Sequence, residues 1–119
     1  MKNVKTDITG AFSEMRGGDF IFKIGKDFIA FKGHFPDEPL LPGIVQIEIA
    51  AFCARKLLNN ADAKLKCADK VKFIKPVRPD TEIICRIELL SLNADEAVFK
   101  AAIKDDKETY SQITLTASV

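Results

Sequence analysis

The segment GIVQIEIAAFCARKLL, from Gly43 to about Leu58, predicts the one convincing helix of the chain. Its first half is apolar almost all round, which is typical of a helix enclosed by other structure. Pro42 and Gly43 open the helix, and Arg55 and Lys56 lie near its C-terminus, where positive charge suits the helix dipole. We therefore expect the rest of the chain to fold around this helix.

Alternating apolar and polar residues predict strands on both sides of the helix. Before it, residues 19–24 and 27–32 predict a hairpin. After it, strands are predicted at residues 64–75, 83–89, 97–103 and 111–119. The pattern favours one α+β domain over residues 1–119, in which a curved antiparallel sheet wraps around one long central helix.

Length and composition indicate a single domain that does not bind a highly charged partner through its overall charge. A chain of 119 residues can bury one core, and its 18 basic residues are balanced by 17 acidic ones. Nucleic acid and membrane surfaces are therefore not expected as partners. The N-terminal stretch MKNVKTDITGAFSEM lacks the apolar core of a signal peptide, and we expect a cytoplasmic protein.

The cysteines and the single histidine argue against a metal site. Cys53, Cys67 and Cys85 are widely spaced and lie in apolar or alternating segments, so we expect core-facing thiols in a reducing compartment. His34 has no second imidazole with which to complete a usual zinc set. The sequence predicts no metal and no other cofactor.

Glu48 is unusual because it is a carboxyl group in an otherwise apolar helix. If it is buried and charged, its desolvation costs several kcal/mol unless it reaches a partner or a cavity. The alternative is a narrow exposed stripe that Glu48 shares with Gln46 and Arg55. The many apolar neighbours leave little of the helix circumference for solvent, which favours a functional carboxyl group.

The segment GHFPDEPLLPG, residues 33–43, is the second unusual feature. It holds the only histidine, His34, and three prolines that stiffen the loop before any tertiary contact forms. The loop leads into the helix, whose first N–H groups and positive dipole end point toward whatever lies beside it. A structural histidine in an ordinary turn is the alternative to a catalytic loop.

These residues together resemble a known family. His34-Phe35-Pro36, Pro39, Leu41-Pro42-Gly43 and the acid at position 48 are similar to the signature of bacterial 3-hydroxyacyl-acyl carrier protein dehydratases of the hot-dog fold. The downstream segment VKFIKPVRP, residues 71–79, extends the resemblance, which covers roughly residues 18–119 of a short family member. The chain departs from the pattern at Asp37, where glycine is usual, and at Phe52, where glutamine is common.

The resemblance implies a site and an assembly. It implies that His34 is the catalytic histidine, that Glu48 is its acidic partner, and that the Gly43 N–H holds the thioester oxygen. It also implies that substrate is bound by Phe35, Pro36, Leu41 and Pro42. In that family the histidine and the acid of one site come from different subunits, so a homodimer or higher homo-oligomer is implied.

The chemistry explains these residue types. Eliminating water across C2 and C3 of a 3-hydroxyacyl thioester needs a base for the C2 proton and an acid for the leaving hydroxide. It also needs a donor for the negative charge that develops on the thioester oxygen. The expected product is the trans-2-enoyl thioester of fatty-acid or related acyl-chain biosynthesis. The rival interpretations are an acyl thioesterase, because the hot-dog fold carries both activities, and a non-catalytic acyl-binding module.

Basic residues gather between positions 64 and 78, which suggests how substrate arrives. Lys72, Lys75 and Arg78 lie where the resemblance puts the approach to the acyl tunnel. A locally positive face would attract an acidic acyl carrier protein, and we expect carrier-bound substrate. The alternative is an ordinary solvated strand face, in which case coenzyme A thioesters become the better expectation.

Overall fold

The computed structural model describes residues 3–28, 31 and 40–119. The elements follow in chain order: α1 (Val4–Ala11), β1 (Phe12–Arg16), β2 (Asp19–Ile24), α2 (Gly43–Leu58), β3 (Leu65–Phe73), β4 (Thr81–Leu92), β5 (Glu96–Lys104) and β6 (Thr109–Ser118). Neither helix of the described part is long and apolar enough to cross a membrane.

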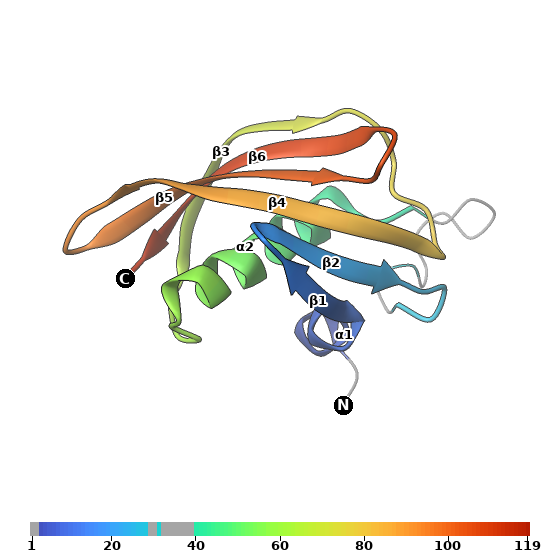
Figure 1. Ribbon diagram of the computed structural model, residues 1–119, viewed down its shortest axis with the longest axis horizontal. Coiled ribbons are helices and arrows are strands. Elements are labelled where there is room, and N and C mark those ends of the chain that lie inside the picture. The colour runs from blue at the N-terminus through green and yellow to red at the C-terminus, as the bar shows by residue number, and fades with distance from the viewer. Residues whose placement is uncertain (1–2, 29–30, 32–39) are drawn as a thin grey trace.

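The strands form one antiparallel sheet that bends around α2. Their order is β1-β2-β4-β5-β6-β3, and every neighbouring pair is antiparallel. Figure 1 shows the sheet arching over α2, with α1 beside β1 and the chain ends on different sides. The predicted α+β architecture, a curved antiparallel sheet around one long helix, is therefore confirmed.

The core lies between α2 and the concave face of the sheet. Alternate residues of β4 and β5 point inward, so Ile83, Cys85 and Phe99 have no exposed surface. Ile49 and Ala50 of α2 are equally buried. Full burial of an Ile or Phe side chain contributes about 1.5–3 kcal/mol, and this packing holds α2 in place along its length.

The bounds of α2 agree with the sequence prediction. The helix ends at a residue in the left-handed αL conformation. Asn59 has φ 51° and ψ 42°, and its N–H donates to the carbonyl oxygens of Arg55 and Lys56. Asparagine tolerates this conformation better than most residues, which explains why the helix stops there. The chain then turns directly into β3.

The predicted hairpin of residues 19–24 and 27–32 is wrong. The first segment is β2, and it pairs with β1 on one edge and with β4 on the other, so it does not form a hairpin with the second segment. Residues 29, 30 and 32 of that second segment lie outside the described residues. The turn instead lies between β1 and β2, where Gly17 adopts φ 59°. Helix α1, which the sequence analysis did not predict, precedes this hairpin.

One of the three cysteines does not face the core. Cys53 and Cys85 are buried, but Cys67 on β3 is exposed, which corrects the expectation of three core-facing thiols. Burial raises the pKa of the Cys53 thiol, and its contact with Cys85 raises it further. Those two thiols therefore act as small apolar core residues.

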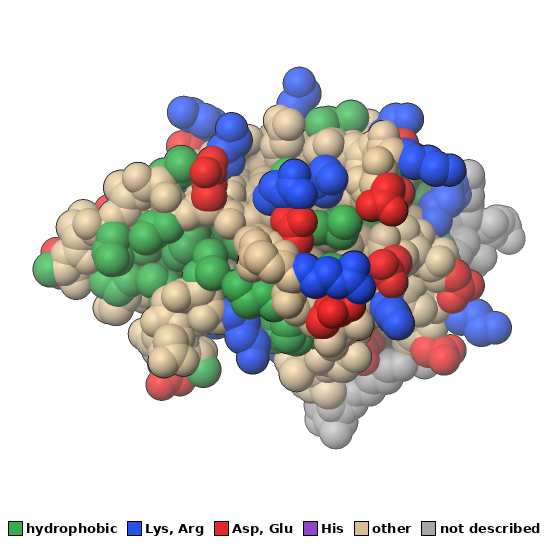
Figure 2. Space-filling view, in the orientation of Figure 1, with side chains coloured by type: hydrophobic (Ala, Val, Ile, Leu, Met, Phe, Trp, Pro, Cys, Tyr) green, Lys and Arg blue, Asp and Glu red, His purple; other side chains and the backbone are tan. Residues whose placement is uncertain are grey.

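The two ends of the sheet differ in how well α2 covers them. The hairpin of β4 and β5 extends past the end of α2, where Figure 2 shows hydrophobic side chains gathered on the surface. Leu89, Leu90 and Leu92 are 46%, 52% and 58% exposed there. A register shift between Leu89 and Ser91 accompanies this overhang.

Candidate functional site

The N-terminus of α2 presents backbone donors without an intrahelical partner. Pro42 occupies the N-cap position, and its carbonyl oxygen accepts from the N–H groups of Val45 and Gln46 at 3.0 and 3.3 Å. The N–H groups of Gly43 and Ile44 precede the first intrahelical donors, and the dipole of α2 adds positive potential beside them. This end of the helix can hold a partly negative oxygen.

Leu41 anchors the segment that leads into α2. Its side chain is only 3% exposed, and its N–H donates to the carbonyl oxygen of Val77 at 2.8 Å. The contact ties the start of α2 to the chain between β3 and β4. Leu41, predicted to bind substrate, therefore has a structural role that positions Pro42 and Gly43.

Gly43 is closely covered by the ring of Phe73 at the end of β3. A Cβ atom added at Gly43 would lie 2.5 Å from Cζ of Phe73, closer than side-chain atoms approach in proteins. Phe73 itself is 52% exposed, so it covers Gly43 while its other face meets solvent. A larger residue at position 43 would therefore force the ring of Phe73 to move, and the preference for glycine here comes from space rather than from backbone conformation.

A cavity of about 420 Å³ opens beside this helix end. It is lined by Leu40, Leu41, Pro42, Gly43, Gln46, Phe73, Ile74, Lys75 and Pro76. We call it the N-terminal cavity. Its walls are mostly apolar and its polar groups are few, which is the usual character of a small-molecule site.

Glu48 lies in a different cavity, of about 700 Å³, beside the C-terminal half of α2. This C-terminal cavity is lined by Lys5, Ile8, Thr9, Glu48, Phe52, Arg55, Lys56, Asn59, Asn60, Ala61, Asp62, Ala63 and Lys64. Glu48 is half-buried. Gln46 is buried on another side of the helix, so the alternative of a shared exposed stripe is wrong for that residue.

Basic side chains surround the cavity that holds Glu48. The Nε of Arg55 donates to the carbonyl oxygen of Ala63 at 2.7 Å, and Nζ of Lys56 lies 5.4 Å from the ring centroid of Phe52. Both cations are therefore held in place by neighbours. The cavity therefore places Glu48, together with the carboxyl group of Asp62, among four basic side chains, those of Lys5, Arg55, Lys56 and Lys64.

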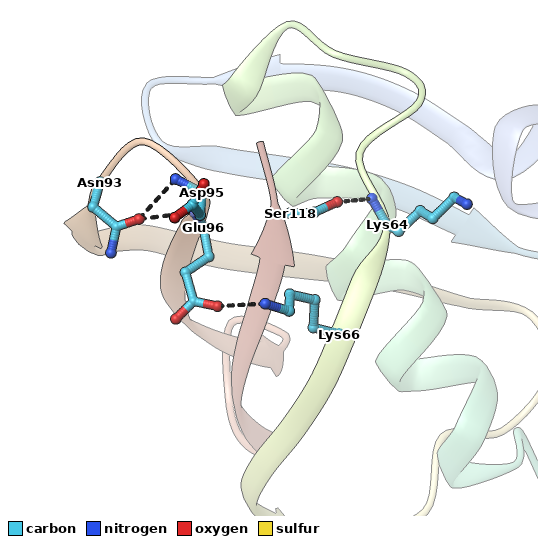
Figure 3. A network of polar contacts seen from close by, with 6 residues as sticks. All are labelled: Lys64, Lys66, Asn93, Asp95, Glu96 and Ser118. Atoms are coloured by element: carbon cyan, nitrogen blue, oxygen red, sulfur yellow. Dashed lines mark hydrogen bonds and ion pairs between the residues drawn. The ribbon is translucent and has the colours of Figure 1, made fainter.

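Hydrogen bonds fix the start of β3 at the edge of this cavity. The N–H of Lys64 donates to Oγ of Ser118 at 3.0 Å, and Nζ of Lys66 pairs with Glu96 at 2.8 Å. Figure 3 shows the side chain of Lys64 pointing away from this network of polar contacts. Asn93 closes the adjoining turn by accepting from the N–H groups of Asp95 and Glu96.

Gly43 and Glu48 occupy different faces of α2. At 100° per residue they are separated by about 140° around the helix axis and roughly 7.5 Å along it. Gln46 lies only about 60° from Gly43 and nearly opposite Glu48 by the same geometry. One described chain therefore presents the donor and the carboxyl group to two separate cavities.

The remaining predicted site residues divide into two groups. His34, Phe35 and Pro36 lie outside the described residues. Lys72 and Arg78 are exposed, whereas Nζ of Lys75 pairs with Glu108 at 2.8 Å. The pairing raises the pKa of Lys75, through its hydrogen bond to Glu108 first and then through their opposite charges.

Gln46 is a site residue that was not predicted from the sequence. It was expected only as part of an exposed stripe, but its side chain is 3% exposed and lines the N-terminal cavity. A signal was available, because burying the amide of a glutamine also costs free energy, although less than burying the carboxylate of Glu48. Among the described residues, no group of three His, Cys, Asp or Glu side chains could hold a metal ion.

Comparison with solved structures identifies the fold. A chain of the dehydratase heterocomplex ApeI:P from Xenorhabdus doucetiae is 25% identical and superimposes with a TM-score of 0.66, over 89% of this chain and 93% of that one. A homologue of HP0420 from Helicobacter felis superimposes with a TM-score of 0.70 at 11% identity, covering 91% of this chain and 85% of that one. The fold is the hot-dog fold.

Comparison of sequences identifies the family. The 3-hydroxyacyl-[acyl-carrier-protein] dehydratases FabZ of Albidiferax ferrireducens and Enterococcus faecalis are 34% and 36% identical over 98 and 92 residues. These matches cover 75% and 72% of this chain and 65% of each relative. The profile of the ApeI-like family, described as ApeI dehydratase, matches residues 13–113. The chain therefore belongs to the ApeI-like dehydratase family, whose hot-dog fold it shares.

Proposed function

We propose that the protein dehydrates a 3-hydroxyacyl thioester, bound to acyl carrier protein, to the trans-2-enoyl thioester. The observation that carries the proposal is the N-terminus of α2, where Gly43 presents a backbone donor beside an open, mostly apolar cavity. Membership of a dehydratase family supports the reaction class, and the curated relatives are named as dehydratases of carrier-bound substrates.

Each proposed group has one role. His34 removes the C2 proton, and the electron pair of that C–H bond forms the C2–C3 double bond. The C3–O bond breaks, and Glu48 protonates the departing hydroxide, so water leaves. The N–H of Gly43 stabilises the negative charge on the thioester oxygen while the proton is being removed. Return of the proton from His34 to Glu48, directly or through water, completes the cycle.

The proposed site needs two chains. Gly43 and Glu48 face different cavities of one chain, and two strand edges, on β1 and β3, stay open among the described residues. An open edge and a half-covered helix favour association with a second chain. We propose that Glu48 of one chain meets His34 and Gly43 of another in a homodimer or a higher homo-oligomer.

A direct assay tests the proposed reaction. The protein is incubated with a 3-hydroxyacyl thioester while absorbance follows the conjugated enoyl product and a thiol reagent follows free thiol. Enoyl product supports dehydration, thiol release indicates a thioesterase, and neither product indicates a non-catalytic module. We expect enoyl product without thiol release.

Variants at the proposed catalytic residues test the assignment. We expect His34→Ala and Glu48→Gln each to lower kcat about 10²- to 10⁴-fold, because each removes one proton-transfer group. Both variants should melt close to the parent. Glu88→Gln, which changes an exposed carboxyl group on β4, is the matched control and should keep full activity. Normal turnover in either catalytic variant would remove that residue from the mechanism.

Charge reversal tests delivery by a carrier protein. Lys75 lines the N-terminal cavity, and the exposed Lys72 and Arg78 flank in sequence the segment of residues 73–76 that lines it. We expect reversal of these three charges to raise KM for carrier-bound substrate roughly 10-fold at low salt, and less at high salt. KM for a small thioester should not change. Lys100→Glu, on the exposed face of β5, is the control. Equal effects on both substrates would rule out docking at this surface.

A further inference from the structure

Gln46 carries a buried hydrogen-bonding group without a partner. Its side chain is 3% exposed, and Oε1 accepts no hydrogen bond within the described part of the chain. Buried polar groups in proteins are almost always hydrogen-bonded, and a buried oxygen without a partner lowers stability. An apolar residue would suit the packing of α2 better, which indicates that the amide serves a bound molecule.

The position of Gln46 indicates where that molecule binds. The side chain lines the N-terminal cavity, one helical turn after Gly43 and on the same side of α2. The two residues are about 4.5 Å apart along the helix axis. The cavity therefore combines backbone donors at its helix end with a buried acceptor deeper along the same helix face.

A second buried oxygen provides a comparison. Oγ of Ser111 on β6 also has no partner within the described residues, and Ser111 has no exposed surface. Ser111 is the register partner of Phe73, the residue that covers Gly43. Unlike Gln46, it is absent from the lining of the cavity. The two residues share burial and an unpaired oxygen but differ in access to a ligand.

We propose that Gln46 is a positioning residue whose Oε1 accepts a hydrogen bond from the thioester bound in the N-terminal cavity. The inference rests on the proposed function for the identity of the ligand. An acceptor needs a donor, and a 3-hydroxyacyl thioester has two near its carbonyl group. These are the O–H on C3 and the amide N–H of the pantetheine arm nearest the sulfur.

The contacts with Gly43 and Gln46 together determine how the substrate is oriented in the cavity. When the thioester oxygen accepts from Gly43, the acyl and thiol parts extend in opposite directions from that point. Gln46 then holds one of these parts and fixes the rotation of the substrate about its bound carbonyl group. Fixing this rotation places the C2 proton in a defined direction relative to the base.

The test compares Gln46→Met with Ser111→Ala. Methionine keeps the unbranched shape of glutamine and removes the amide, while Ser111→Ala removes an equally buried oxygen outside the cavity lining. Both variants should melt close to the temperature of the parent, because each removes a buried oxygen that has no partner within the described part of the chain. Only Gln46→Met should raise, by roughly 10-fold, the dissociation constant or the KM of the ligand that carries the donor.

The ligands distinguish the two donors. Dissociation constants are measured by calorimetry for two saturated acyl thioesters that cannot eliminate water, one of N-acetylcysteamine and one of butanethiol, which lacks the amide. Weaker binding of the N-acetylcysteamine thioester alone identifies the amide N–H as the donor. Unchanged binding of both, with KM raised for the 3-hydroxyacyl substrate, identifies the C3 hydroxyl.

Other results overturn the inference. Equal behaviour of Gln46→Met and Ser111→Ala on every ligand would remove the positioning role, and so would a lower melting temperature with unchanged binding and KM. Failure of the proposed function gives a different result. The parent would then bind the saturated thioesters without converting the hydroxylated one, and the binding comparison would still decide the role of Gln46. A parent that binds none of these ligands contradicts both proposals.

Discussion

Gly43 is the position at the candidate site where the ring of Phe73 leaves no room for an added side-chain carbon. Gly43→Ala keeps the backbone N–H but places a Cβ atom 2.5 Å from Cζ of Phe73, so the ring has to move into the space beside the helix end. We expect the variant to lose roughly 10-fold or more in kcat/KM, because small displacements at a reacting centre have large effects.

A second substitution separates crowding from loss of the donor. Phe73→Leu shortens the side chain over Gly43, so the double variant should recover most of the activity that Gly43→Ala loses. Gly10→Ala is the control, because a Cβ atom at Gly10 meets nothing within 4 Å, and it should leave activity unchanged. If kcat/KM of the double variant stays as low as that of Gly43→Ala, crowding by Phe73 is not the cause.

Single residues were predictable where their chemistry conflicted with their surroundings. The carboxyl group of Glu48 drew attention because charge in an apolar helix is costly, and the structure places it at a cavity. Gln46 has a weaker conflict, since a neutral amide also suits a helix surface. Gln46 is buried because its side of α2 meets the sheet. The side of α2 that meets the sheet is determined by contacts between residues distant in sequence.

At the scale of the element, β3 contains a bulge whose conformation is unusual for its residue. The pairing with β6 shifts between Asp69 and Lys72, and Lys70 has φ 49°. A side chain in this region costs about 1 kcal/mol relative to glycine. We expect Lys70→Gly to raise the free energy of unfolding by up to about 1 kcal/mol.

A neighbouring lysine provides the control for that substitution. Lys72 is also exposed on β3, but its backbone has ordinary strand pairing with Gln112. Lys72→Gly should lower the free energy of unfolding by roughly 0.5–1 kcal/mol, because glycine weakens a regular strand. Denaturant unfolding of both variants measures the difference. A loss of stability in Lys70→Gly equal to that in Lys72→Gly would contradict the argument.

The helix and strands with a clear hydrophobic periodicity were predictable from the sequence, whereas the pairing of the strands was less predictable. The apolar run from Gly43 to Leu58 and the alternation in β4, β5 and β6 gave the correct type and nearly correct bounds. Gly17-Gly18 and Gly25-Lys26 both suggest a turn at an end of β2. Local sequence cannot show which neighbour takes an edge of β2, because pairing depends on the whole sheet.

At the scale of the whole molecule, the placement of groups on different faces of α2 predicts a site shared between chains. His34→Ala and Glu48→Gln should each be inactive alone. When the two are unfolded together and refolded, about half of the dimers combine one chain of each kind, and each such dimer has one intact site of two. The mixture should then recover about a quarter of the parental activity.

Refolding each variant by itself is the control, and it should give no recovery. A sedimentation experiment on the same samples measures the fraction of dimer. A mixture that forms dimers but stays inactive would mean that each site lies within one chain, and a fully active monomer at low concentration would mean the same. The assay therefore tests the arrangement of the site independently of how the chains associate.

The uneven burial of the three thiols gives the molecule a natural label for its own association. Cys67 is exposed on β3, a strand at the edge of the sheet, whereas Cys53 and Cys85 are enclosed in the core. A thiol-specific fluorophore should therefore attach to the folded chain at this single point, without any engineered cysteine. Because the attachment point lies on an open edge, its rate of modification reports whether another chain covers that edge.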